Sequence, residues 1–123
     1  MDVVYFPDDP RPPRWMSPVL ALGNFDGLHR GHQKIVERIR RSAADRGATA
    51  LVLTFDPRPP RVVRPDKAPP LLMTMPQKVA ALEKAGLHGV AVVRFTEAFS
   101  RLSPDQFVRQ VLVDWLRVSE VWV

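Results

Sequence analysis

The 123-residue chain contains no cysteine and no long apolar run, and each of these absences excludes some classes of protein. The absence of cysteine excludes a disulfide framework and any metal site built from thiolates. No stretch approaches the roughly 20 apolar residues that a membrane-spanning helix needs. The first residues, MDVVYFPDDPRPPRW, hold acids and prolines where a signal peptide carries a basic and then an apolar run. We therefore expect a soluble, cytoplasmic protein with no membrane partner.

Basic residues outnumber acidic ones, with 18 Lys and Arg against 13 Asp and Glu, so the net charge is +5. Such a charge attracts anions, either nucleotide phosphates or nucleic acid. The basic residues are scattered, and they are not interleaved with the aromatic side chains on which single-strand binders stack bases. We therefore expect small-molecule nucleotides as partners and no nucleic acid.

Apolar runs alternate with helical patterns along the chain. The runs predict a short strand at 3–6, buried strands at 18–23, 48–55 and 89–95, and a further strand near the end, within VSEVWV. Amphipathic helices are predicted from 31 to Gly47, from 75 to Gly86, and from 104 through 116. TMPQ and SPDQ have the spacing of capping boxes before the second and third helices. The pattern indicates an α/β domain with a doubly wound parallel sheet over residues 18–123, preceded by a strand and a proline-rich arm over 1–17.

The stretch GNFDGLHRGHQ, residues 23–33, lies where a predicted strand passes into a helix. The first turn of a helix offers unpaired N–H groups and partial positive charge, which suit phosphate. Glycines leave the backbone open to a polyphosphate. His29 and His32, three residues apart, can donate hydrogen bonds to phosphate oxygens while negative charge shifts during a displacement. The alternative is that the glycines only form a tight turn.

GNFDGLHRGHQ resembles the HxGH signature of the nucleotidyltransferase superfamily. With GNFDG before the histidines, it closely resembles prokaryotic FAD synthetases, the bifunctional riboflavin kinase and FMN adenylyltransferase enzymes. LTFDPRPP resembles the second motif of that family, and the likeness continues over residues 68–108. The resemblance implies a Rossmann-like nucleotidyltransferase fold. It also implies adenylyl transfer from ATP to FMN, giving FAD and pyrophosphate, usually with Mg²⁺.

The resemblance also assigns site residues. It implies that His29 and His32 are the catalytic donors. The ATP-binding residues that it implies are Gly23, Asn24, Phe25, Asp26 and Gly31, with a structural cap on the turn as the alternative role of Asp26. The flavin-binding residues that it implies are Phe55, Asp56, Pro57, Arg58 and Pro59, with a stiff solvent loop as the alternative. No residue is assigned as a metal ligand.

The chain departs from the family pattern in two ways. Arg58 replaces a histidine of the second motif, and Val63 replaces an aromatic residue, so a charge switch and a stacking ring are lost. Family members also continue with further flavin and ATP motifs and a kinase domain, none of which follows here. We therefore expect a truncated adenylyltransferase domain of impaired activity that self-associates through its last strand. The alternatives are another HxGH nucleotidyltransferase and a non-catalytic nucleotide-binding module.

Overall fold

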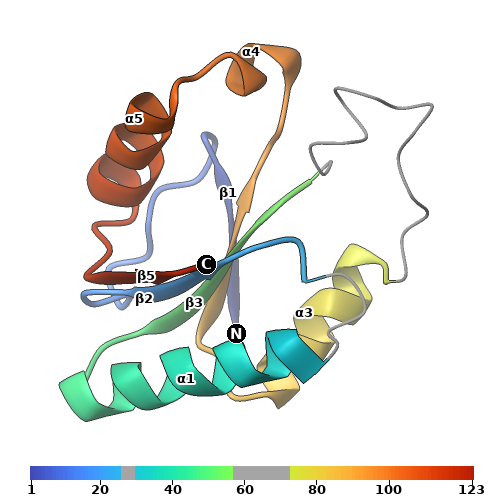
Figure 1. Cartoon of the computed structure of the whole chain (residues 1–123), viewed down its shortest axis with the longest axis vertical. Coiled ribbons are helices and arrows are strands. Elements are labelled where there is room, and N and C mark those ends of the chain that lie inside the picture. Colours follow the sequence, from blue (N-terminus) through green and yellow to red (C-terminus); the bar gives the residue numbers. More distant parts are fainter. Residues whose placement is uncertain (26–29, 57–72) are drawn as a thin grey trace.

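The computed structural model describes residues 1–25, 30–56 and 73–123. It contains a five-stranded parallel sheet with the order β1-β4-β3-β2-β5 (Figure 1). The strands are β1 (Asp2–Phe6), β2 (Val19–Leu22), β3 (Ala50–Phe55), β4 (Gly89–Val93) and β5 (Glu120–Trp122). Each one lies within or beside a run that the sequence pattern predicts, so the α/β fold with a parallel sheet is confirmed.

Helices cover both faces of the sheet. α1 (Arg30–Arg46) and α3 (Met75–Lys84) lie on one face, and α4 (Glu97–Ser100), α5 (Pro104–Phe107) and η2 (Val108–Trp115) lie on the other (Figure 1). α1 ends at Arg46 and is followed by Gly47, which has a φ of 64°. Both predicted capping boxes are confirmed, at Thr74 and Ser103. In the described segments, no helix is both long and apolar enough to cross a membrane.

The helix predicted after Ser103 is present, but it is α-helical only over α5 and continues as the π-helix η2. The N–H of Leu116 donates to the carbonyl of Val111, five residues earlier, at 3.0 Å. Hydrogen bonding at this spacing brings residues five apart toward one face. Val111 and Leu116 are both fully buried against the sheet, so the wider turn is stabilised by core packing.

The central strands alternate between two cores. Val19 and Ala21 of β2 face the core beneath α1 and α3, whereas Leu20 faces the core beneath η2. β3 and β4 alternate in the same way. This burial of both faces explains why the strands are continuous apolar runs in the sequence.

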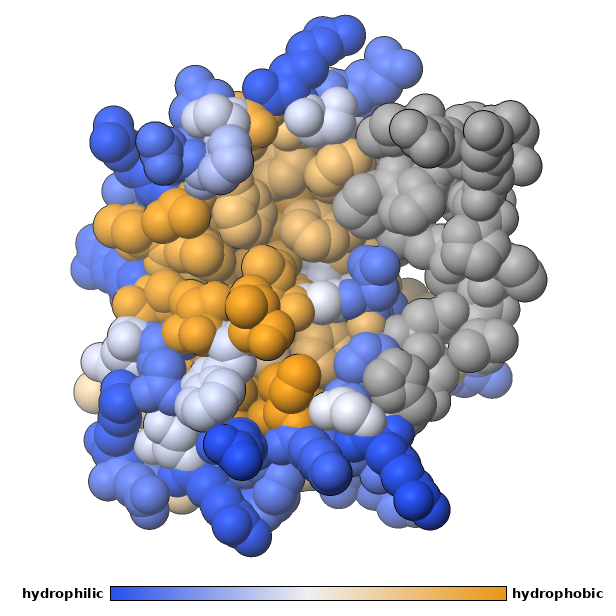
Figure 2. Space-filling model, viewed as in Figure 1, coloured by the Kyte–Doolittle hydropathy of each residue, from blue (hydrophilic) through white to orange (hydrophobic). Residues whose placement is uncertain are grey.

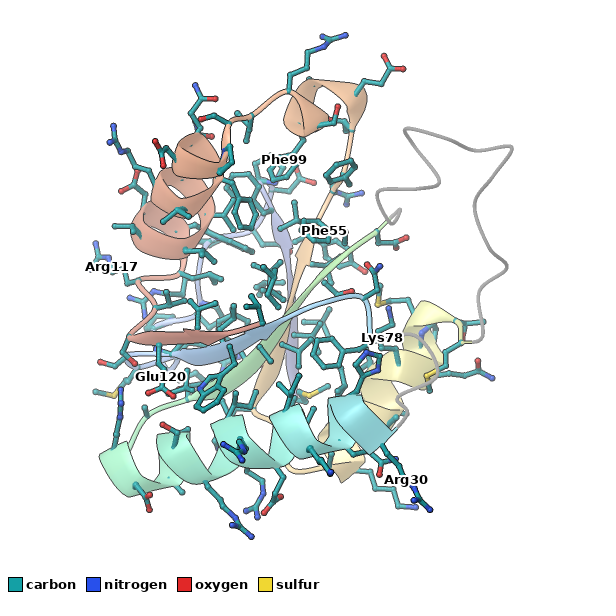
Figure 3. The ribbon with its side chains drawn as sticks, in the orientation of Figure 1. Arg30, Phe55, Lys78, Phe99, Arg117 and Glu120 are labelled. Atoms are coloured by element: carbon teal, nitrogen blue, oxygen red, sulfur yellow. The ribbon has the colours of Figure 1, made fainter. Side chains whose placement is uncertain are left out.

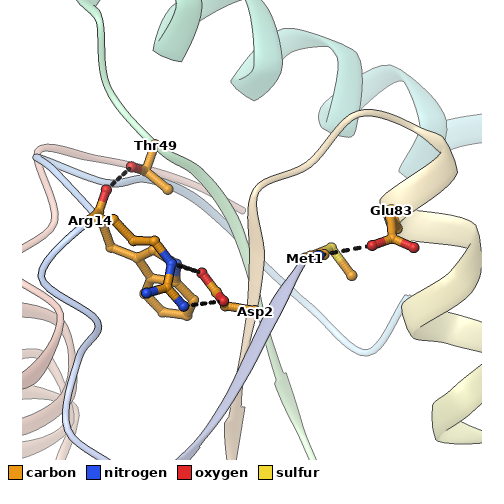
Figure 4. Close-up of polar contacts among 6 residues, drawn as sticks. Met1, Asp2, Arg14, Thr49 and Glu83 are labelled. Carbon is orange, nitrogen blue, oxygen red and sulfur yellow. Dashed lines mark hydrogen bonds and ion pairs between the residues drawn. The ribbon is translucent and has the colours of Figure 1, made fainter.

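The proline-rich arm between β1 and β2 is tied to the fold by its own side chains. Trp15 is 1% exposed, and its indole N–H donates to Asp2 at 3.2 Å. Arg14 forms an ion pair with Asp2, and its carbonyl accepts a hydrogen bond from the hydroxyl of Thr49 at 3.3 Å (Figure 4). Trp115 on η2 donates to the carbonyl of Asp9 at 2.9 Å. The arm therefore joins β1, β2 and η2 into one unit.

The sheet has an apolar edge at β5. Apolar side chains gather across the middle of the face shown in Figure 2, where Figure 1 places β5. Val121 of this strand is 38% exposed, and Val123 is 87% exposed. Glu120 links the same strand to α1 through an ion pair with Arg46 at 2.5 Å.

Candidate functional site

The carboxyl ends of β2, β3 and β4 meet at one edge of the sheet, which we call the carboxyl edge. From β2 the chain runs through β3 to β4, and it then crosses to β5 on the other side of β2. The direction of winding thus reverses beside β2. Ligands of doubly wound folds bind outside the carboxyl ends of the strands at such a reversal. The segment that follows β2 is therefore where the topology favours a ligand.

Side chains from two neighbouring elements hold the backbone immediately after β2. The carbonyl oxygen of Asn24 accepts a hydrogen bond from the hydroxyl of Thr54 on β3 at 3.2 Å. It accepts a second from the ammonium group of Lys78 on α3 at 2.5 Å. The next residue, Phe25, has a φ of 53°. A bulky residue in this left-handed region carries strain of about 1–3 kcal/mol, which persists only where the surroundings hold it in place.

The ring of Phe25 connects this turn to the first turn of α1. The ring is 1% exposed, and its centroid lies 4.8 Å from that of the His32 imidazole. There is little space for a side chain at Gly23, because an added Cβ would lie 3.1 Å from Cε2 of Phe25. Gly23 thus permits the ring of Phe25 to pack closely against the turn, and that ring in turn lies against His32.

The structure brings several of the predicted ATP-binding and catalytic residues together at this turn. Gly23 and Asn24 form it, and Gly31 and His32 lie in the first turn of α1, where Gly31 is exposed and His32 half-buried. Phe25 lies in the core, so it offers a ligand its backbone rather than its ring. Two further predicted residues, Asp26 and His29, lie outside the described residues.

Positive charge surrounds the outer face of α1. Arg30, Lys34, Arg38 and Arg41 line a shallow groove of about 570 Å³ along this helix. Glu37 lies among them, and its hydrogen bond from Arg40, followed by that from Arg41, holds the pKa of its carboxyl below the ordinary value. The first turn of α1 contains no acidic residue. The amino end of α1 therefore combines its own partial positive charge with basic side chains, which favours anions.

On the opposite face of the sheet, the same carboxyl edge holds a cavity of about 230 Å³, which we call the aromatic pocket. Its walls include Leu22 from the end of β2 and four phenylalanine rings, those of Phe55, Phe95, Phe99 and Phe107. The ring centroid of Phe55 lies 5.5 Å from that of Phe95 and 6.3 Å from that of Phe107. Figure 3 shows Phe55 and Phe99 on one side of the sheet and Lys78 and Arg30 on the other.

One predicted flavin-binding residue, Phe55, lies in this pocket. Asp56 follows it, exposed, with its N–H donating to the carbonyl of Val93 at 3.0 Å. The other three, Pro57, Arg58 and Pro59, lie outside the described residues, as does Val63.

Among the residues of this edge, sequence reasoning missed Thr54, Lys78 and the rings of Phe95, Phe99 and Phe107. A signal existed for Lys78, because it lies four residues before the fully buried Leu82 on the apolar face of α3, where a lysine is unusual. Phe95 and Phe99 lie shortly after the carboxyl end of β4, Phe95 in the connection and Phe99 on α4, and a position so close to the end of a buried strand was a further signal.

Comparison with known proteins identifies the family. The model of the FAD synthetase family matches residues 12–123. The bifunctional riboflavin kinase/FMN adenylyltransferase of Bacillus subtilis is 42% identical over 96 residues, which cover 77% of this chain and 30% of that protein. The Escherichia coli enzyme of the same name is 36% identical over 101 residues, which cover 82% of this chain and 32% of that protein.

A solved structure, described as a macrolide-efflux protein from Streptococcus pneumoniae, superposes with a TM-score of 0.79. It covers 98% of this chain and 40% of its own at 20% identity, so the likeness concerns the fold alone. The chain spans about a third of the length of the curated relatives it matches. Because the family model extends over most of the sequence, the chain belongs to the FAD synthetase family.

Proposed function

We propose that this domain transfers the adenylyl group of ATP, taken as its magnesium complex, to FMN. A phosphate oxygen of FMN attacks the α-phosphorus of ATP. The bond from the α-phosphorus to the oxygen that bridges it to the β-phosphorus then breaks. FAD and pyrophosphate are the products. The observation that supports this reaction best is that a polar turn and an aromatic pocket occupy the two faces of the sheet at the same carboxyl edge.

The polar side suits the triphosphate. Asn24, His32 and the amino end of α1 lie together there, next to the basic face of α1. Hydrogen-bond donors and a helix amino terminus stabilise the charge that develops on the leaving pyrophosphate. His32 is the described side chain to which we assign this donation. In this reaction the protein contributes chiefly by positioning the two substrates and stabilising charge.

The aromatic pocket suits the flavin ring. Its four phenylalanine rings present apolar faces and edges, against which a planar heterocycle can stack or pack edge-on. Leu22 is the last residue of β2 and Phe55 the last of β3, so the pocket lies at the carboxyl edge. We therefore place the flavin ring in this pocket, with its phosphate-bearing chain toward the turn after β2 at the same edge.

Pyrophosphate release with FMN and Mg-ATP tests the proposal. Replacement of His32 by alanine removes one aimed donor, and we expect kcat to fall by about 30- to 1,000-fold, which corresponds to about 2–4 kcal/mol. The urea midpoint of this variant should change little, since His32 is half-buried on the first helical turn.

A second variant separates the acceptor from the nucleotide. Phe99→Ala opens the aromatic pocket and should raise KM for FMN while KM for ATP is unchanged. Release of pyrophosphate with another phosphorylated acceptor but none with FMN would indicate a different nucleotidyltransferase. Binding of Mg-ATP without pyrophosphate release for any acceptor would indicate a non-catalytic module.

A further inference from the structure

Among the residues that the structure describes, Lys78 is the charged residue that is buried, with 5% of its surface exposed. Lysine is rarely buried without polar partners, because the ammonium group loses its hydration. Its position on α3 is four residues before Leu82, on the face that packs against the sheet. An aliphatic side chain such as methionine would fill that position and avoid the loss of hydration. The lysine therefore has to be explained by what its ammonium group contacts.

The position of Lys78 is fixed by the defined start of α3. The capping box of Thr74 and Gln77 and the proline in the first turn define where α3 begins. The N–H of Lys78 then donates to the carbonyl of Thr74 at 3.0 Å, so Lys78 lies in the first complete turn. From this anchored position its side chain reaches the carbonyl of Asn24, 54 residues away in the sequence (Figure 3 shows Lys78).

The carbonyl of Asn24 is held from two directions. A carbonyl oxygen accepts two hydrogen bonds, and here the donors come from different elements, Thr54 on β3 and Lys78 on α3. Thr54 is fully buried, so its hydroxyl is as fixed as the strand. The two bonds fix the peptide plane between Asn24 and Phe25. That peptide precedes the residue with a φ of 53°.

The Phe25 ring links the fixed peptide to His32. With the peptide plane fixed, Phe25 stays in its left-handed conformation and its ring lies 4.8 Å from the imidazole of His32. If the peptide rotated, Phe25 would relax toward a more favourable φ and its ring would leave that position. The imidazole would then lose the surface against which it is packed.

We propose that Lys78 is a positioning residue, which holds the Asn24 carbonyl and, through Phe25, sets the orientation of the His32 imidazole toward the nucleotide phosphates. The part of this inference that concerns catalysis rests on the proposed function. The part that concerns the orientation of His32 does not, and it is measured separately.

The experiment compares four variants. Lys78→Met keeps most of the aliphatic stem and removes the donor, and Lys78→Arg keeps a donor and the charge. Thr54→Val removes the other donor to the same carbonyl. Lys84→Met, in the exposed last turn of the same helix, makes the same change in charge away from the turn and is the matched control.

The first readout is the NMR signal of the His32 ring protons, assigned among three histidines with the aid of His32→Ala. Because the Phe25 ring lies against the imidazole, a displaced ring changes this chemical shift. We expect a clear shift in Lys78→Met, a shift in the same direction in Thr54→Val, a smaller one in Lys78→Arg and none in Lys84→Met.

The second readout is the kinetics of adenylyl transfer. Misplacement of a reacting group by about 1 Å costs about a hundredfold, so we expect kcat of Lys78→Met to fall by about ten- to a hundredfold. KM for ATP should change much less, and Lys78→Arg should recover part of the loss. A residue that only stabilised the fold would lower the urea midpoint and leave kcat of the folded fraction unchanged.

A folded Lys78→Met protein with the wild-type His32 signal would overturn the proposal. If that variant does not fold, Thr54→Val decides, and an unchanged His32 signal in it would overturn the proposal equally. Lack of adenylyl transfer by the wild-type chain would refute the proposed function, whereas the NMR comparison would still test the role of Lys78.

Discussion

Replacement of Gly23 by alanine tests whether close packing behind the turn controls the site. The added Cβ would lie 3.1 Å from Cε2 of Phe25, so the ring has to retreat by a few tenths of an ångström. The ring has no free direction, since it is 1% exposed and lies against His32. Its displacement is therefore transmitted to the imidazole.

The magnitudes follow from that displacement. Overpacking a buried site costs about 1–3 kcal/mol, and the small overlap here places Gly23→Ala near the lower end. Misplacement by about 1 Å costs about a hundredfold in rate, so a few tenths of an ångström should lower kcat/KM by about fourfold to tenfold. The variant should thus lose activity more clearly than it loses stability.

Two other glycines provide matched controls for urea denaturation and pyrophosphate release. Gly47 has a φ of 64° and nothing within 4 Å of an added Cβ, so Gly47→Ala should cost about 1–2 kcal/mol from backbone strain and keep full activity. Gly89→Ala would place its Cβ 2.4 Å from Cζ2 of the buried Trp15 and should be the least stable of the three. Full activity of Gly23→Ala, or an activity loss in Gly47→Ala of the same size, would refute the reasoning.

Two further predictions concern β5. The pKa of Glu120 lies below its ordinary value because of hydrogen bonds from Trp122 and then Ser42, with the charge of Arg46 adding to them. The stability that this carboxylate contributes is therefore present above the ordinary glutamate pKa, about 4.3, and is lost as the pH falls through the lower folded-state value. In urea titrations, the difference between wild type and Glu120→Gln should be present at pH 7 and vanish below the folded-state pKa, and a difference that persisted there would contradict this origin. We also propose that the exposed edge of β5 pairs with a second copy, so Val121→Lys should reduce the mass measured by light scattering at high concentration, and a wild-type chain that stayed monomeric would rule this out.

The elements that the sequence predicted well are those whose signals are local. The buried strands are continuous apolar runs, and Gly47, which the sequence marks as a helix cap, follows the last residue of α1. The two capping boxes need only residues three apart. Each of these signals lies within a few residues, so one stretch of chain suffices to interpret it.

The parts that could not be predicted depend on contacts between distant segments. The hydrogen bond from Lys78 to Asn24 joins residues 54 apart, and only the sheet order brings α3 beneath the turn after β2. The aromatic pocket gathers rings from the end of β3, from the segment after β4, and from α4 and α5. The π-helical form of η2 arises from the burial of Val111 and Leu116 on the assembled sheet.

Departures from ordinary folding rules gather at the turn after β2. Ser17 and Arg117 also have positive φ values, but both are exposed polar residues in connections, where such a conformation needs no core packing around it. Phe25 instead combines a positive φ with a buried aromatic ring. The carbonyl just before it, that of Asn24, accepts a hydrogen bond from the buried Lys78. Each feature lowers stability by itself, and both are retained around one carbonyl. Natural sequences keep such costs mainly where function requires them, which is why we place the chemistry at this turn.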